Sequence, residues 1–152
     1  MVSETFLPAP QDNICALVVG EHPEMRRMLK LILAGLALHV DEVSSNHQLL
    51  HTFSKVPRVV VVDVDPAYAQ GMAVWHALRR NALTAHVPSV FLVEAGNKFI
   101  RHMATIAGAT VCLDKPFHPR HLRTIVTDLL SSTTPPDAPD AHRSGVRRPA
   151  AL

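Results

Sequence analysis

The chain has 152 residues, of which 47% are hydrophobic and 18% are charged, and its formal net charge is +2. This length suits one domain with a sizeable core, and this composition is typical of a soluble globular protein. A charge this small, with no stripe of Lys or Arg in the globular part, argues against nucleic-acid binding. Cys15 and Cys112 both lie in apolar segments, so we expect buried thiols in a reducing compartment.

The two ends of the chain differ from its middle. Residues 1–12 are polar, contain proline and lack the basic start and apolar core of a secretion signal, so they are predicted to be a flexible leader. Residues 132–152 are rich in Pro, Ser and Ala and are predicted to be a disordered tail. No apolar run is long enough to span a membrane. These features predict a cytoplasmic protein without membrane attachment.

Between the ends, short apolar runs alternate with amphipathic stretches. The runs predict strands at 14–19, 40–43, 58–64, 87–93 and 110–113. The stretches between and after them predict helices at 24–38, 46–54, 71–80 and 97–108, and a last one from Pro119. Parallel strands need crossovers, which helices supply. The fold class is therefore α/β, with a five-stranded parallel sheet covered by helices on both faces.

The apolar spacing also predicts which helix faces turn inward. In the helix at 24–38, basic residues take the outer side, whereas Leu31 and Leu38 widen the apolar stripe. That extra width fits either core or a docking face, and core is the favoured interpretation. In the helix at 97–108, ended by a glycine, the residues predicted to face inward are Phe99, Ile100, Met103 and Ile106.

The segment from Arg58 to Asp65 is central to the chain. Its four consecutive valines are typical of a strand buried on both faces. Asp63 and Asp65 follow as the apolar run ends, and a carboxylate so near a core is costly to bury. Asp63 therefore either opens into a ligand site at the carboxyl edge of the sheet or caps the next turn. The segment by itself does not decide between them.

Two further charged residues fall at the same edge. Glu21 follows the first predicted strand and Lys115 follows the fifth. In the strand order 2-1-3-4-5, these side chains would surround Asp63 and Asp65. Clustered carboxylates repel unless a cation bridges them, and oxygen ligands of this kind suit Mg²⁺.

At these residues the chain resembles the receiver domain of bacterial two-component response regulators. The resemblance covers 13–131 and rests on VVVVDVD, on Gly71 after the acceptor, and on AHVPSVFL, AGAT and LDKPF. The intervals between Asp63, Val93 and Lys115 also match the family's spacing. The family's fold is the flavodoxin-like one, with strand order 2-1-3-4-5.

The resemblance implies a role for each matching residue. Asp63 is similar to the phosphoacceptor, which attacks a phosphohistidine of a partner kinase. Lys115 corresponds to the lysine that neutralises phosphoryl oxygens. Glu21 takes the second of two acidic positions and would ligate Mg²⁺, together with Asp63. Asp65 is where the family gives a backbone carbonyl to the metal and a variable side chain to the pocket.

Several positions depart from the family pattern. Gly20 stands in place of the first acid, and Ala67 in place of a proline. Val93 replaces the Thr or Ser whose hydroxyl binds the phosphoryl group, and valine has no donor. Glu94 replaces a small residue, and Cys112 replaces the aromatic switch residue. The chain thus resembles a degenerate receiver.

Two consequences for the site stay open. In the first, Asp65 stands in for the acid missing at Gly20, and Mg²⁺ binding and slow phosphorylation are kept. In the second, Glu94 pairs with Lys115 and holds the domain in one state. In either case we expect Mg²⁺ binding to be weak or absent and phosphorylation by small donors to be poor. His22, at the rim, is expected to tune the charge of Glu21.

The resulting interpretation is a stand-alone, atypical receiver that signals by protein contacts and is not an enzyme. Its expected partners are a sensor histidine kinase or phosphotransfer protein, a downstream protein, and a second copy of the chain. The expected contact surfaces are the helix at 24–38 for the kinase and the region 97–130 for output. The alternatives are a phosphorylation-independent adaptor or dimerisation module, and a phosphoryl-group sink. The ten histidines lack metal-site spacing and are expected at the surface or at helix caps.

Overall fold

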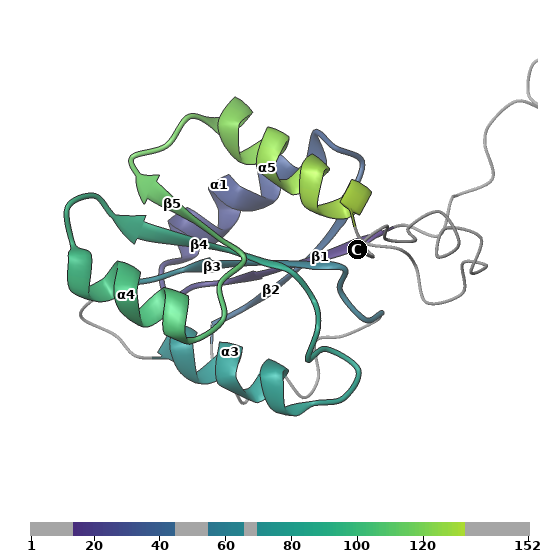
Figure 1. Ribbon diagram of the computed structural model, residues 1–152. Coiled ribbons are helices and arrows are strands. Elements are labelled where there is room, and N and C mark those ends of the chain that lie inside the picture. The colour runs from purple at the N-terminus through teal and green to yellow at the C-terminus, as the bar shows by residue number, and fades with distance from the viewer. Residues whose placement is uncertain (1–13, 45–54, 66–69, 133–152) are drawn as a thin grey trace, which may run out of the picture.

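The computed structural model describes residues 14–44, 55–65 and 70–132. Its parallel strands form one sheet in the order β2-β1-β3-β4-β5 (Figure 1). The strands are β1 Cys15–Val19, β2 His39–Val43, β3 Val59–Asp63, β4 Ser89–Glu94 and β5 Val111–Lys115. The helices are α1 Pro23–Ala34, α3 Gln70–Arg80, α4 Lys98–Ile106 and α5 Pro119–Ser132. The predicted fold class and strand order are confirmed.

Some predictions fall outside the residues that the structure describes. They are the leader at 1–12, the helix at 46–54, the replaced proline position Ala67, and the tail beyond Ser132. Within the described ranges, no helix is long and apolar enough to cross a membrane.

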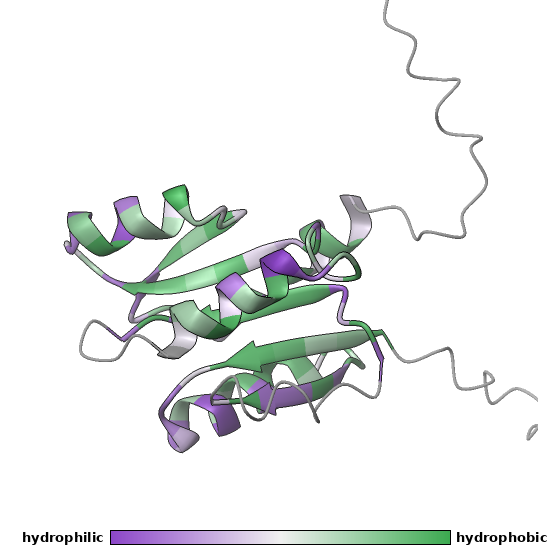
Figure 2. Ribbon diagram, turned by 90° about the horizontal axis from the view of Figure 1, so that it is seen from below, coloured by the Kyte–Doolittle hydropathy of each residue, from purple (hydrophilic) through white to green (hydrophobic). Residues whose placement is uncertain are grey.

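The sheet is covered on both faces, with α1 and α5 on one side and α3 and α4 on the other (Figure 1). Figure 2 shows most of the sheet as hydrophobic, and β1, β3 and β4 consist mainly of apolar residues. The valines of β3 are fully buried because alternate side chains enter the two core layers. Val61 packs with Leu29 of α1 and Leu122 of α5. Val62 packs with the α3 side chains around Trp75.

The first helix is shorter than predicted. It ends at Ala34, and Ala37 then adopts a left-handed conformation with φ 60°, which brings Leu38 into the core after the helix has ended. Leu31 does not join the core, because its side chain is 70% exposed. The favoured interpretation of Leu31 as core is therefore wrong.

The inner face of α4 was predicted correctly only for Ile100. Phe99, Met103 and Ile106 are 69%, 42% and 67% exposed. The side of α4 that packs on the sheet is formed instead by Ile100 and Ala104, rotated by about 100° round the helix. Small Ala104 lets the helix lie close to the sheet, so the larger apolar residues are left on the outside.

The two cysteines are free and differ in environment. Cys15 is buried in β1 and its thiol donates to Asp41 Oδ2 over 3.3 Å. Burial, followed by this hydrogen bond, raises the pKa of the Cys15 thiol to about 12. Cys15 is therefore an inert structural thiol. Cys112 is only partly buried, against the α3 and α4 side of the core.

Candidate functional site

The ends of β1 and β3 lie side by side at the carboxyl edge of the sheet. Val19 of β1 is paired with Val62 of β3, so Gly20 and Asp63 follow as neighbours. Asp63 is only 3% exposed, although it is the last residue of its strand. A carboxylate buried to this degree needs a charged or hydrogen-bonding partner.

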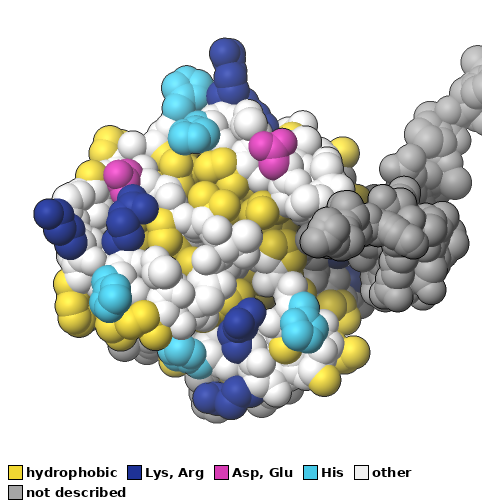
Figure 3. Space-filling model, in the orientation of Figure 1, with side chains coloured by type: hydrophobic (Ala, Val, Ile, Leu, Met, Phe, Trp, Pro, Cys, Tyr) yellow, Lys and Arg dark blue, Asp and Glu magenta, His cyan; other side chains and the backbone are white. Residues whose placement is uncertain are grey.

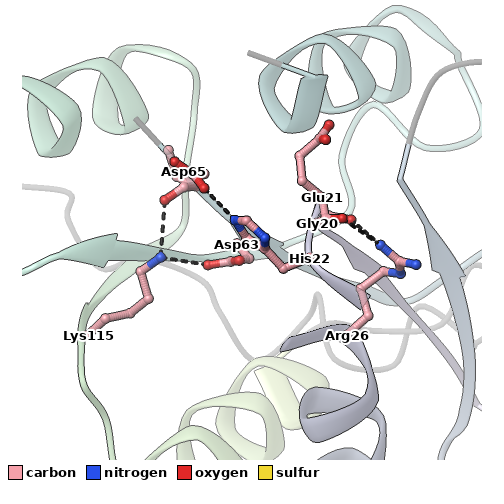
Figure 4. A network of polar contacts seen from close by, with 8 residues as sticks. Gly20, Glu21, His22, Arg26, Asp63, Asp65 and Lys115 are labelled. Atoms are coloured by element: carbon pink, nitrogen blue, oxygen red, sulfur yellow. Dashed lines mark hydrogen bonds and ion pairs between the residues drawn. The ribbon is translucent and has the colours of Figure 1, made fainter. Parts of the chain in front are cut away.

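That partner is Lys115, the last residue of β5. Its Nζ lies 2.7 Å from Asp63 Oδ1 and donates also to the carbonyl oxygen of Val64 over 3.2 Å (Figure 4). β4 separates β5 from β3 in the sheet, so the long lysine side chain spans a whole strand to reach the acid. Sequence reasoning placed both residues at this edge, and the structure brings them into contact.

The predicted magnesium ligands are not gathered. The carboxylate of Glu21 points away from Asp63, and Asp65 Oδ2 lies 2.5 Å from His22 Nε2 (Figure 4). Among the described residues, no group of three or more His, Cys, Asp or Glu side chains could hold a metal ion. The structure therefore does not bring the side chains of Glu21, Asp63 and Asp65 together, and their role as Mg²⁺ ligands stays a prediction.

His22 occupies a different role from the one expected. It is the N-cap residue of α1, yet its side chain makes no capping bond. The ring instead reaches across the loop to Asp65. The hydrogen bond to Asp65 is the main cause that raises the pKa of His22 above 6.5, and the charges of Asp65, Asp63 and Glu21 add to it. The His22 ring is thus hydrogen-bonded to Asp65, a partner that the sequence analysis did not predict.

Gly20 and Arg26 shape the side of the site that lacks the first acid. A Cβ added at Gly20 would lie 3.2 Å from Asp63 Cβ, a tight contact, and 3.7 Å from Asp63 Oδ2. Arg26 Nη1 donates to the carbonyl oxygens of Gly20 and Glu21 over 2.7 and 3.2 Å, and Arg26 Nε donates to Glu42 over 3.2 Å. The loop is therefore braced from α1.

Sequence reasoning had assigned Arg26 to the outer side of its helix and missed this role. The available signal was its position, because a side chain in the first turn of a helix points back toward the preceding loop.

The switch positions keep the properties that their residue types predict. Val93 is fully buried and Glu94 is exposed. Glu94 and Lys115 are paired in the β4–β5 register, but in the described part of the chain the Lys115 ammonium forms its ion pair with Asp63 and none with Glu94. The expectation that Glu94 pairs with Lys115 is therefore wrong. Cys112 is a free, half-buried thiol in the position of the aromatic switch.

The predicted capping role of histidines holds at α5. The backbone N–H of Arg120 donates to His118 Nδ1 over 3.0 Å. His118 and His121 line a shallow hollow with Arg120 and Thr124. Pro119 is the first residue of the helix, as predicted.

The sheet has the strand order 2-1-3-4-5, and a buried aspartate meets a lysine at its carboxyl edge. This arrangement is that of the receiver class of signalling domain. The model of the response regulator receiver domain family matches residues 16–127. The chain belongs to this family, which acts in two-component signalling.

A curated relative and several solved structures are similar to the chain. The probable transcriptional regulator ycf27 of Cyanophora paradoxa is 27% identical over 130 residues, which are 85% of this chain and 53% of the relative. The chain thus spans about half the length of that relative. The crystal structure of a response regulator from Chloroflexus aurantiacus is 26% identical with a TM-score of 0.68, covering 78% of this chain and 98% of that one.

A further solved structure shares the fold at lower identity. It is the receiver domain of sensor histidine kinase PA1611 from Pseudomonas aeruginosa, crystallised with a magnesium ion coordinated in its active-site cleft. It is 20% identical with a TM-score of 0.67, and the alignment covers 79% of this chain and 99% of that one.

Proposed function

We propose that the chain is an atypical receiver of a bacterial phosphorelay, with Asp63 as its phosphoacceptor and with signalling, not enzymatic turnover, as its role. The observation that carries the proposal is the 2.7 Å contact between Asp63 Oδ1 and Lys115 Nζ at the carboxyl edge of the sheet. An aspartate that is 3% exposed and held by one lysine is a poor helix cap but a well-positioned nucleophile.

The chemistry follows from the two oxygens of Asp63. Oδ1 accepts from Lys115, and Oδ2 faces the gap at Gly20. Oδ2 attacks the phosphorus of a phosphohistidine, so that a P–O bond forms, the P–N bond breaks, and the imidazole leaves with the bonding electrons. Lys115 then neutralises the new phosphoryl oxygens as a point charge.

Receiver domains bind Mg²⁺ beside the acceptor aspartate, and we propose that this chain binds it weakly. The proposal is supported by the side chains around Asp63. Gly20 supplies no carboxylate, the Glu21 side chain points away (Figure 4), and Asp65 is engaged by His22. A weakly bound metal leaves phosphoryl transfer without most of its charge neutralisation, so transfer is expected to be slow.

The exposed apolar side of α4 is the proposed surface for a downstream partner or a second copy. Phe99, Met103 and Ile106 lie on one side of the helix at spacings of four and three residues. Figure 3 shows hydrophobic, basic and histidine side chains side by side over α4. Exposed residues of this size grouped on one face are typical of an interaction site.

The proposed surface for a kinase or phosphotransfer protein is α1. His22, Met25 and Met28 line a cavity of about 400 Å³ at the start of this helix, together with Pro23 and Glu24. Leu31 is exposed one turn further along. Flexible methionines adapt to different partner side chains. The cavity adjoins the loop between β1 and α1, and Gly20 of this loop lies beside Asp63.

Phosphotransfer from a labelled sensor histidine kinase of the same organism tests the proposal. We expect label on the wild-type chain and none on Asp63→Asn, with binding to the kinase unchanged by the substitution. Label that persists on Asp63→Asn would refute the assignment of the acceptor.

A second candidate function, a phosphorylation-independent adaptor, is favoured by the fully buried Val93, which cannot donate the switch hydrogen bond. Output that survives in Asp63→Asn would favour this candidate. Label that accumulates on Asp63 without any output would instead favour a phosphoryl-group sink.

A further inference from the structure

Two loops meet beside Asp63 through a contact between two side chains. His22 belongs to the connection between β1 and α1, and Asp65 lies just beyond β3. Their side chains approach to 2.5 Å between His22 Nε2 and Asp65 Oδ2 (Figure 4). The contact therefore ties together two segments that are 43 residues apart in sequence.

The contact lies near the carboxylate of Asp63. Gly20 lies against one side of Asp63 and Lys115 holds its Oδ1 from another. The His22 ring is close enough to feel the charge of Asp63, and Figure 4 draws the ring alongside this carboxylate. Asp63 is 3% exposed in this arrangement.

We propose that the contact between His22 and Asp65 is a clasp that limits access of phosphodonors to Asp63. This inference rests on the proposed function, because the clasp would regulate access to the same carboxylate that the proposed function makes the phosphoacceptor. In place of a metal ion that joins the two loops, a histidine and an aspartate join them directly. The closed clasp protects Asp63 from small donors, and its opening admits them.

The clasp is able to open without unfolding of the domain. The His22 side chain is 52% exposed and Asp65 is 21% exposed, so water competes for both groups. Exposed ion pairs of this kind hold only weakly, and both residues lie at the ends of strands and helices, where local movement is cheapest. The His22 ring also lines the cavity on α1, so a protein docked there would contact the clasp.

Carboxylate labelling measures access to Asp63 without any phosphate chemistry. The full chain is treated with a water-soluble carbodiimide and glycine ethyl ester, and the modified positions are quantified by peptide mass spectrometry. We expect His22→Ala to raise labelling at Asp63 several-fold, and Asp65→Asn to do the same while keeping the loop's shape. The exposed Glu94 serves as an internal reference, and His121→Ala, on the remote α5, as the matched control variant.

The outcomes separate the clasp from the proposed function. Labelling of Asp63 that stays at the wild-type level in both clasp variants, with their circular dichroism unchanged, would overturn the clasp. If labelling rises and the wild type is phosphorylated at Asp63, acetyl phosphate should modify Asp63 of the clasp variants faster by a similar factor. A measurable rate that stays at the wild-type value would also overturn the clasp's control of access. If labelling rises but no variant, nor the wild type, is ever phosphorylated at Asp63, the clasp stands and the phosphoacceptor assignment fails.

Discussion

Lys115 is expected to be the main support of the buried Asp63 carboxylate. Lys115→Met removes the cation that lies 2.7 Å from Asp63 Oδ1 and leaves a carboxylate that is 3% exposed without its charged partner. Breaking a fully buried pair in this way costs about 3–5 kcal/mol. The Lys115 side chain is 22% exposed, so water offsets part of this loss and we expect about 2–3 kcal/mol of destabilisation.

Urea unfolding followed by the fluorescence of the buried Trp75 measures this change. Lys98→Met, at an exposed position of α4, is the matched control and should change stability by less than about 0.5 kcal/mol. Adding Asp63→Asn to Lys115→Met removes the unpaired charge and should recover most of the loss. If Lys115→Met were no more destabilising than Lys98→Met, the pair would not be holding Asp63 and the site's geometry would be refuted.

Three further predictions concern the neighbouring loop and the first helix. Gly20→Asp should lower stability without metal, since its Cβ would lie only 3.2 Å from Asp63 Cβ and its charge would add to that of Asp63. The same substitution should tighten Mg²⁺ binding, measured by calorimetry, at least tenfold, or about 1.4 kcal/mol, and an unchanged affinity would contradict the role given to this position. The pKa of His22 by NMR should lie above 6.5 and fall in Asp65→Asn. The contact therefore adds stability below pH 6.5 that is lost as pH rises through the raised pKa, and a pKa unaffected by Asp65→Asn would refute this. Leu29→Ala should cost about 2–5 kcal/mol and Leu31→Ala under about 0.5 kcal/mol in urea unfolding, and equal costs would contradict the exposure of Leu31.

The sheet could be predicted from the sequence because its signals are strong and local. The four consecutive valines of β3 leave the strand without a polar face, so both of its faces must be buried. The ends of each predicted strand lie within two residues of the observed ends. Parallel order then brought Asp63 and Lys115 to one edge. The positions of Asp63 and Lys115 in the site therefore follow from where their strands end.

The inward faces of the helices were harder to predict, because the spacing of apolar residues shows that a helix has an apolar stripe but not how the helix is rotated about its axis against the sheet. On α4, Phe99 and Ile100 are adjacent apolar residues, and only packing against the sheet decides that Ile100 turns inward. On α1, Leu31 fits an apolar stripe equally well, but the sheet beneath is already covered by Leu29 and its neighbours. Tertiary packing decided both positions.

The contacts among the loop side chains could not be predicted from residue type. Glu21, Asp65 and Glu94 were all suitable partners for a cation at this edge, and sequence order does not tell which pairs form. In the structure Asp65 is taken by His22 and Lys115 by Asp63, while the Glu21 side chain points away (Figure 4). The orientation of a few side chains therefore separates a magnesium site from the arrangement observed.

The central claim is that Asp63 is a receiver's acceptor in a site poorly built for metal. The most direct measurement is a time course of intact mass with acetyl phosphate, with and without Mg²⁺, for the wild type and Asp63→Asn. We predict slow, incomplete phosphorylation of the wild type, little accelerated by Mg²⁺, and none of Asp63→Asn. Rapid, stoichiometric and Mg²⁺-dependent phosphorylation, or equal modification of Asp63→Asn, would contradict the account.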